Sequence, residues 1–287
     1  MEKYDTLVFS GGSLKCLSQI GCIKYFEEKN ILKNIRNYVG TSGGTLILLF
    51  LVLDYSYEEI RDFFITISNS VILLSINPEQ ILELFDNYGL NDGSIIKNIV
   101  REALYKKLFQ EDITFIELAK KTGKNFIICA SNIEQVKSSY FCLENTPDVN
   151  VVDAIMASCA IPILFNPVEI NDVLYVDGGI YNNFPINYDK INKKTSFGIN
   201  IYSNNINTST FLGYLKCIIN SVIVNNIEKN KISNDNPNVL DLYIDDINWF
   251  SINDLKINFR KQHIDDFINT GYNKIKAHFD LLKTGIK

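Results

Sequence analysis

The chain has 287 residues, of which 46% are hydrophobic and 21% are charged, so it contains enough apolar material for a sizeable core. This composition excludes a collagen, a coiled coil and a disordered chain. The formal net charge is −5 and no run of basic residues occurs, which argues against nucleic acid as a partner.

The six cysteines show no paired C-x-x-C spacing, and only two histidines are present to complete a zinc site. We therefore expect free thiols in a reducing compartment and no bound metal. The first residues lack the positive and apolar regions of a signal peptide. The longest apolar run, residues 46–53, is far shorter than the roughly 18 to 20 residues of a membrane span. These features predict a cytoplasmic protein without a transmembrane segment.

Short apolar runs that end at turns alternate along the chain with segments of helical periodicity. The expected strands, in chain order, are residues 6–9, 38–39, 125–130, 139–143, 173–176, 197–202 and 239–244. The expected helices are residues 17–30, 45–53, 57–64, 78–85, 94–108, 114–121, 211–227 and 263–282, with Ser94 as the cap of its helix. This alternation predicts a three-layer α/β/α sandwich with a mostly parallel central sheet covered on both faces. No linker-like stretch interrupts the chain, so we expect a single domain over residues 1–287.

The first expected strand ends in a glycine-rich turn, residues 10–16, at the start of a helix. The adjacent Gly11 and Gly12 leave backbone N–H groups exposed there, which makes a concavity suited to an anion. A dinucleotide-binding loop would need further glycines where Ser13 and Cys16 stand, and no phosphate-binding loop of the G-x-x-x-x-G-K form is present. Stabilising a tetrahedral oxyanion needs only the amides and is compatible with these residues. The alternative is a plain turn between strand and helix.

The second expected strand ends in a G-x-S-x-G motif that is followed by an apolar helix. The motif consists of Gly40, Thr41, Ser42, Gly43 and Gly44. A nucleophilic serine must project its hydroxyl from a tight turn, and glycines on either side remove the Cβ atoms that would clash there. The positive end of the following helix would face the charge that develops during acyl transfer. We interpret Ser42 as a nucleophile, and the alternative is a serine that only caps the helix.

A nucleophilic serine needs a general base, and the sequence offers two candidates. Asp177 ends an apolar strand and is followed by Gly178 and Gly179. Burial would raise its pKa towards a useful range, whereas the alternative is an aspartate that only starts a turn. His263 follows Ser42 and Asp177 in the chain order of an α/β-hydrolase triad. It lies in a polar stretch, where a solvated surface histidine is the simpler interpretation.

Together these motifs resemble the patatin-like phospholipases, a family of serine acyl hydrolases with a Ser–Asp dyad and no histidine. Three features of that family occur here in the same order: a glycine-rich loop at Gly11, a nucleophile motif at Ser42 and an Asp-Gly-Gly motif at Asp177. The connecting segments that are also similar are residues 89–93, 114–124, 153–162 and 183–185. The similarity covers about residues 4–185, and we expect residues 186–287 to complete the same domain.

The resemblance implies a phospholipase A-type reaction in which Ser42 attacks an acyl ester of a glycerophospholipid. It implies that Asp177 is the base and that no cofactor or metal takes part. The oxyanion would be held by loop amides and by the amide after the nucleophile, which the family pattern places at Gly11, Gly12, Ser13 and Gly43. A phospholipid substrate would bring the protein to a membrane surface.

The chain departs from the family pattern at Ser13 and Cys16, which replace glycines, while Lys15 lies where the family has Arg or Lys. If position 13 requires a positive φ, a serine there is strained and its amide is misaligned. Losing one oxyanion donor typically costs about 10²- to 10³-fold in rate. A catalytically weak or inactive lipid- or protein-binding member of the fold therefore stays open, as does an esterase that uses His263.

Three apolar segments, residues 63–64, 71–76 and 249–250, are candidates for a lipid-facing mouth. Core packing is the use that we expect for most of them.

Overall fold

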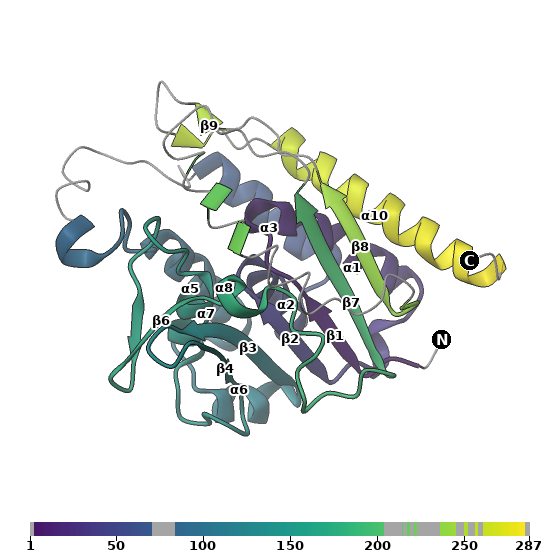
Figure 1. Cartoon of the computed structure of the whole chain (residues 1–287). Coiled ribbons are helices and arrows are strands. Elements are labelled where there is room, and N and C mark those ends of the chain that lie inside the picture. The colour runs from purple at the N-terminus through teal and green to yellow at the C-terminus, as the bar shows by residue number, and fades with distance from the viewer. Residues whose placement is uncertain are drawn as a thin grey trace.

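The computed structural model describes residues 3–70, 84–203, 214, 217–218, 221–222, 236–244, 250–251, 256–257 and 261–284. Figure 1 shows a twisted central sheet with helices packed against it. Within the described residues this sheet has eight strands, seven of which follow the order β5-β6-β3-β2-β1-β7-β8 while β4 pairs with β3. The strands are β1 (Thr6–Phe9), β2 (Asn37–Thr41), β3 (Asn125–Asn132), β4 (Lys137–Phe141), β5 (Val168–Ile170), β6 (Val173–Asp177), β7 (Ser196–Ser203) and β8 (Val239–Ile244). The short strands β9 (Phe250–Ser251) and β10 (Lys256–Ile257) form a separate antiparallel pair.

The centre of the sheet is parallel. Strand β1 pairs in parallel with β2 and β7, and the parallel pairing continues outwards to β3 and β8. Strands β4, β5 and β6 pair antiparallel at one side of the sheet. Alternate residues of β1 enter different clusters, since Leu7 and Phe9 join the larger core and Val8 the smaller one. The central strands are therefore buried on both faces, as their continuous apolar runs predict.

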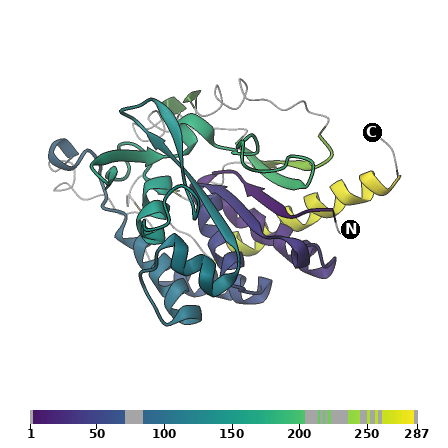
Figure 2. The same ribbon diagram turned by 90° about the horizontal axis from the view of Figure 1, so that it is seen from below.

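Most of the described helices lie on one side of the sheet, as Figure 2 shows. The helices are α1 (Leu17–Glu28), α2 (Gly43–Val52), α3 (Tyr57–Ser70), α5 (Ser94–Leu108), α6 (Phe115–Thr122), α7 (Val151–Cys159), α8 (Gly179–Asn182) and α10 (Lys261–Thr284), with 3₁₀ turns η1 (Ser13–Cys16) and η2 (Leu32–Asn34). Helices α1, α2, α3, α5, α6, α7 and α10 contribute to the larger core. The smaller core on the opposite face includes Ile186, Tyr188 and Ile191. No helix in the described ranges is long and apolar enough to span a bilayer.

Helix α10 joins the end of the chain to its beginning by packing along α1. A Cβ atom at Gly21 would collide with the carbonyl oxygen of Ile268, and one at Gly271 would collide with the carbonyl oxygen of Ser18. The two helices therefore approach at a distance that only glycine permits at these positions. The rings of Tyr25 and Phe279 stack beside this contact at 5.4 Å.

The predicted α/β fold is confirmed, and so are the strands expected at residues 6–9, 197–202 and 239–244. The prediction that Ser94 caps its helix is wrong. Gly93 is the cap residue with a φ of 72°, and the side chain of Asp92 accepts the N–H of Ser94. Helix α7 and strand β5 are additional elements that the periodicity did not predict.

The segments proposed for a lipid-facing mouth are only partly described. Phe63 is buried and Phe64 packs against the core, where both rings contact Phe50. These two residues therefore have the packing role that we expected. Residues 71–76 and Trp249 lie outside the described residues, as do residues 78–83 and most of the expected helix 211–227.

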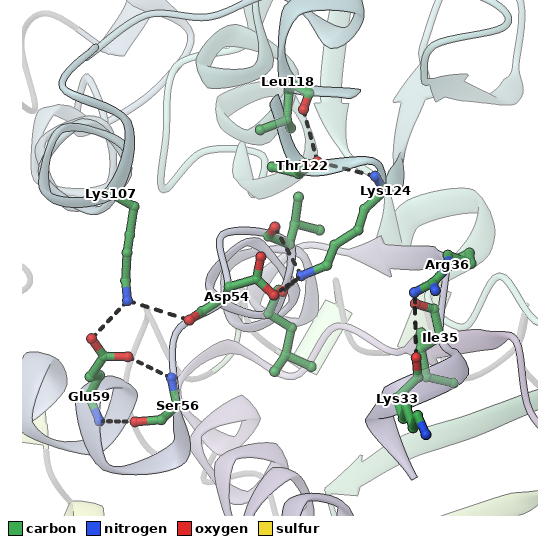
Figure 3. Close-up of polar contacts among 12 residues, drawn as sticks. Lys33, Ile35, Arg36, Asp54, Ser56, Glu59, Lys107, Leu118, Thr122 and Lys124 are labelled. Carbon is green, nitrogen blue, oxygen red and sulfur yellow. Dashed lines mark hydrogen bonds and ion pairs between the residues drawn. The ribbon is translucent and has the colours of Figure 1, made fainter. Parts of the chain in front are cut away.

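Helix α2 is almost wholly buried, and its C-terminal end is closed by a lysine (Figure 3). Lys124 Nζ donates to the carbonyl oxygens of Leu51 at 2.6 Å and Val52 at 3.2 Å, and it pairs with the carboxylate of Asp54. A cation is favourable at this end of a helix because the last carbonyl groups carry partial negative charge. The N-terminal end of α2 begins directly after Ser42.

Candidate active site

Two strands converge end to end on one edge of β3. Strand β4 pairs with residues 128–132 of β3 along one edge of that strand. Strands β2 and β6 pair with residues 125–129 and 130–132, which overlap the residues paired with β4, so both must lie on the opposite edge of β3. On that edge Cys129 faces Thr41 of β2, and the next residue, Ala130, faces Asp177 of β6. Strand β2 is parallel to β3 and β6 is antiparallel, so their C-terminal ends meet. The residue after Thr41 and the last residue of β6 are thus brought together.

Ser42 lies in the tight turn between β2 and α2. Its φ is 52° and its ψ is −131°, a conformation that is strained for a residue other than glycine. Its side chain makes no capping hydrogen bond to α2, which removes the alternative of a simple helix cap. Instead the Ser42 hydroxyl donates to Asp177 Oδ2 at 2.6 Å. The strain therefore directs the hydroxyl away from the helix and towards the carboxylate.

The two carboxylate oxygens of Asp177 have different partners. Oδ1 accepts the N–H of Gly179 at 2.7 Å, while Oδ2 accepts the Ser42 hydroxyl. Asp177 thus both begins the turn that follows β6 and binds Ser42. Asp177 is only 4% exposed, and this burial raises its pKa to about 6, although the hydrogen bonds from Ser42 and Gly179 oppose the rise. A carboxylate with this pKa is a better proton acceptor than an exposed aspartate, and it is still ionised at neutral pH.

The glycine-rich loop after β1 packs directly on Ser42. A Cβ atom at Gly11 would stand 3.1 Å from the Cβ of Ser42 and would collide with the side chain of Asn183. A Cβ atom at Gly43 would stand 2.8 Å from the carbonyl oxygen of Ser13. Within the described residues, the N–H groups of Gly12 and Ser13 make no hydrogen bond. The loop therefore combines close approach to Ser42 with amides that are available to a ligand.

Hydrogen bonds from several elements fix the start of this loop. The N–H of Gly11 donates to the carbonyl oxygen of Asn183, and the Asn183 amide donates to the carbonyl oxygen of Gly11. Gln19 of α1 donates to the carbonyl oxygen of Ser10 at 3.1 Å, and the Ser10 hydroxyl accepts the N–H of Ile201. Contacts of this kind let a protein hold a strained backbone in one conformation.

Both departures from the glycine pattern lie in this loop. Ser13 has a φ of 53°, so it bears the strain expected of a residue other than glycine. It nevertheless keeps the positive φ that a glycine would adopt, so its N–H is not turned away from the loop. Cys16 lies beneath the loop, where its Sγ would be 3.3 Å from a Cβ at Gly12 and 2.9 Å from one at Gly43. The Cys16 thiol donates to the carbonyl oxygen of Ser10. This side chain thus fills the space between the loop and the first turn of α2.

We expect Ser13→Gly to stabilise the protein, because glycine adopts a positive φ without the steric cost that an L residue bears. The free energy of unfolding should rise by about 0.5 to 1 kcal/mol, since the greater freedom of glycine in the unfolded chain offsets part of the gain. Urea unfolding measures the effect. Ser13→Ala is the matched control, because it removes the hydroxyl and keeps the strain. Equal stability of the glycine and alanine variants would contradict this account.

The other predicted residues take more peripheral positions. His263 is partly exposed in the first turn of α10, and Asp265 two residues later pairs with Arg61 of α3. The second histidine, His278, has its Nε2 at 3.1 Å from the carbonyl oxygen of Pro237, and burial lowers its pKa. Lys15 lies partly exposed in η1. The hydroxyl and carboxylate that meet in this structure are thus those of Ser42 and Asp177, without an imidazole between them.

Two further residues lie at the site without having been predicted from the sequence. The Ser158 hydroxyl accepts the N–H of Ser42 at 2.8 Å. Asn183 binds Gly11 through both its main chain and its side chain. Both residues occur in segments that resemble the family, but nothing local in those segments indicates contact with a residue more than a hundred positions away.

The cysteines around the site are free and buried. Burial raises the pKa of Cys129 to about 12 and raises those of Cys16 and Cys159 as well, so all three are neutral thiols at physiological pH. Across the described ranges, no group of three or more His, Cys, Asp or Glu side chains is arranged to hold a metal ion.

Comparison with known proteins identifies the family. A family model described as patatin-like phospholipase matches residues 7–189, well over half of the chain. The chain therefore belongs to the patatin-like phospholipase family. It is 34% identical over 204 residues to the probable lipid hydrolase 463L of Invertebrate iridescent virus 6, and the match covers 67% of each chain. Family membership and this similarity support lipid hydrolysis as the general activity.

Solved structures show the same fold. VipD from Legionella pneumophila has a TM-score of 0.60 and 16% identity, and the match covers 97% of this chain and 67% of VipD. ExoU from Pseudomonas aeruginosa, in its complex with SpcU, has a TM-score of 0.52 and 14% identity. That match covers 97% of this chain and 51% of the ExoU chain. At these identities the likeness concerns the fold alone.

Proposed function

We propose that the protein is a serine lipid acyl hydrolase of phospholipase A type, which cleaves acyl esters of glycerophospholipids through an acyl-enzyme on Ser42. The observation that carries the proposal is the 2.6 Å hydrogen bond from the Ser42 hydroxyl to Asp177 Oδ2, between two residues that are both buried. At hydrogen-bonding distance a base can take the proton of a nucleophile directly.

In the first half-reaction, Ser42 Oγ attacks the ester carbonyl carbon as its proton passes to Asp177 Oδ2. The carbonyl oxygen becomes an oxyanion, whose stabilisation we assign to the amides of Gly12, Ser13 and Gly43 together with the N-terminal end of α2. The expected fourth donor, the N–H of Gly11, donates to the carbonyl oxygen of Asn183 instead. When the tetrahedral intermediate collapses, the bond to the leaving alcohol breaks. The alcohol takes its proton from Asp177, and the acyl group stays on Ser42.

In the second half-reaction, Asp177 accepts a proton from a water molecule that attacks the acyl carbonyl. A second tetrahedral intermediate forms in the same oxyanion site. Its collapse releases the fatty acid, and the proton returns from Asp177 to Ser42 Oγ. One carboxylate thus serves as base and then as acid in each half-reaction. With these proton transfers the atoms and charges of both half-reactions balance.

The direct contact favours a dyad over a triad. In a Ser-His-Asp triad the imidazole lies between the hydroxyl and the carboxylate. Here the Ser42 hydroxyl donates straight to Asp177 Oδ2, and the 2.6 Å separation leaves no room for an intervening ring. The raised pKa of Asp177 supplies part of the basicity that imidazole would provide.

Labelling with a fluorophosphonate probe tests the nucleophile without assuming a substrate. We expect a covalent adduct on the peptide that contains Ser42, and we expect the labelled protein to lose fatty acid release from phosphatidylcholine vesicles. A triacylglycerol emulsion provides the second arm, because faster release from the emulsion would overturn the phospholipid assignment and keep the acyl hydrolase. The absence of both labelling and turnover of a short-chain nitrophenyl ester would support the non-catalytic binder instead.

The rate of ester hydrolysis should fall at acidic pH, because protonation of Asp177 removes the base. Because its pKa is raised to about 6, we expect kcat/KM for a soluble nitrophenyl ester to be constant above about pH 7 and to fall about tenfold per pH unit well below pH 6. Circular dichroism over the same pH range is the control for unfolding. Loss of activity in His263→Ala at every pH would instead indicate that the imidazole takes part in the reaction.

A further inference from the structure

One turn of the protein binds both members of the Ser42–Asp177 pair. This turn is the C-terminal end of α7, residues 158–160. The Ser158 hydroxyl accepts the N–H of Ser42 at 2.8 Å, and the carbonyl oxygen of Ala160 accepts the N–H of Asp177 at 2.8 Å. The carbonyl oxygen of Ser158 also accepts the N–H of Gly178 at 3.3 Å. A single short segment thus connects the ends of β2 and β6.

The Ser158 hydroxyl also connects this turn to β3. It donates to the carbonyl oxygen of Cys129 at 2.6 Å while it accepts the N–H of Ser42. The side chain of Thr45 is a more distant neighbour at 3.4 Å. Because Cys129 faces Thr41 in the ladder, the hydroxyl bridges β2 and β3 at the residue where β2 turns into α2. Ser158 is fully buried, so these hydrogen bonds are shielded from bulk solvent.

We infer that Ser158 is a positioning residue, which holds the backbone of Ser42 in its strained conformation so that Oγ faces Asp177 Oδ2. The inference rests on the proposed function and extends it to a residue that touches neither the substrate nor the reacting atoms. Ser42 has a φ of 52°, and a strained turn keeps one conformation only while its surroundings determine it. Ser158 supplies such a contact to the amide of the nucleophile itself.

Ser158→Ala removes the hydroxyl and leaves a void no larger than one oxygen atom. We expect kcat to fall about 10- to 100-fold, because a misplacement of about 1 Å at the reacting atoms costs up to about 10²-fold. KM should change less than about threefold, since Ser158 does not line the substrate site. The acid limb of the pH profile should move to higher pH, because the hydrogen bond from Ser42 that lowers the pKa of Asp177 is weakened.

If Ser158→Ala is partly unfolded, the observed rate constant of fluorophosphonate labelling is divided by the folded fraction, which circular dichroism measures, so that only folded molecules are compared. Ser158→Thr restores a hydroxyl and should recover most of the labelling rate. The matched control is Ser196→Ala, since Ser196 is equally buried and its hydroxyl donates only to the carbonyl oxygen of Asn192. This control should label within about twofold of the wild type.

The outcomes separate this inference from the proposed function. If the wild type is labelled at Ser42 and Ser158→Ala is labelled within about threefold of its rate, the positioning role is wrong and the proposed function stands. A threonine variant that folds but is as slow as the alanine variant would also overturn the positioning role. If the wild type itself is not labelled at Ser42, the proposed function fails.

Discussion

Replacement of Ser42 by alanine should reduce kcat for ester hydrolysis by about 10⁴-fold or more, because the variant has no atom that can form the acyl-enzyme. The fold should survive, since alanine fits the space of the serine side chain. The rate of fatty acid release from phosphatidylcholine vesicles and the rate of nitrophenyl ester hydrolysis both measure the effect. Fluorophosphonate labelling should disappear in the same variant.

Ser196→Ala is the control for losing a buried hydroxyl, and it should keep wild-type turnover. Thermal unfolding of both variants shows whether a loss of rate reflects a loss of structure. If Ser42→Ala keeps the wild-type rate, the hydrolysis comes from another residue or another protein in the sample. If neither the wild type nor the variant turns over any ester, the binding role suggested by Ser13 becomes the better interpretation.

Asp177→Asn should reduce kcat by about 10³- to 10⁴-fold, because the amide preserves the shape of the carboxylate but cannot accept the proton of Ser42. The His263→Ala variant is the informative control, and we expect it to keep most of the activity. Steady-state kinetics on a soluble ester compare the two variants at pH 8, where the native carboxylate is ionised. If His263→Ala lost nearly all activity and Asp177→Asn kept most of it, a triad that uses His263 would be indicated.

The same Asp177→Asn substitution should raise stability. The pKa of Asp177 rises from 3.8 to about 6 on folding, so between these values the folded protein binds more protons than the unfolded chain. Wild-type stability therefore falls as the pH rises through this window, and the full effect corresponds to about 3 kcal/mol above it. Asparagine carries no charge and avoids this cost.

Urea unfolding at pH 8 should therefore show Asp177→Asn to be more stable than the wild type by about 1 to 3 kcal/mol. The difference should shrink as the pH falls towards 3.8 and disappear below about pH 3, where Asp177 is neutral in both states. A variant that is inactive and less stable at pH 8 would show that the carboxylate holds the fold together. Opposite effects on rate and stability are the expected sign of a residue kept for chemistry.

The parts of the site that the sequence predicts are local in the chain. Ser42 stands out because a strand, a glycine-flanked serine and an apolar helix follow one another within a few residues. Asp177 stands out because it ends an apolar strand before two glycines. Neither pattern reveals that the two residues meet. That contact follows from the shared edge of β3, which pairs segments far apart in sequence.

The two site residues that the sequence did not predict make contacts with residues far away in the chain. Ser158 is separated from Ser42 by 116 positions, and Asn183 from Gly11 by 172. Within their own segments both look like ordinary polar residues near a helix end. Ser94 failed in a different way, since a serine before an apolar helix fits a cap, yet Gly93 has the positive φ and takes that position. Tertiary contacts decided the first two cases, and local backbone geometry decided the third.

Because β2 and β6 meet end to end on β3, the separation of the two reacting groups follows from the register of these strands. Ser42 and Asp177 are 135 positions apart in the chain. Yet Thr41, the residue before Ser42, pairs with Cys129 of β3, and Asp177 pairs with the next residue, Ala130. Helices α3, α5 and α6 lie within that interval and take no part in the ladder. Their lengths do not enter the strand register that sets the separation of the two groups, so an insertion in a loop between these helices leaves both strand ends in place.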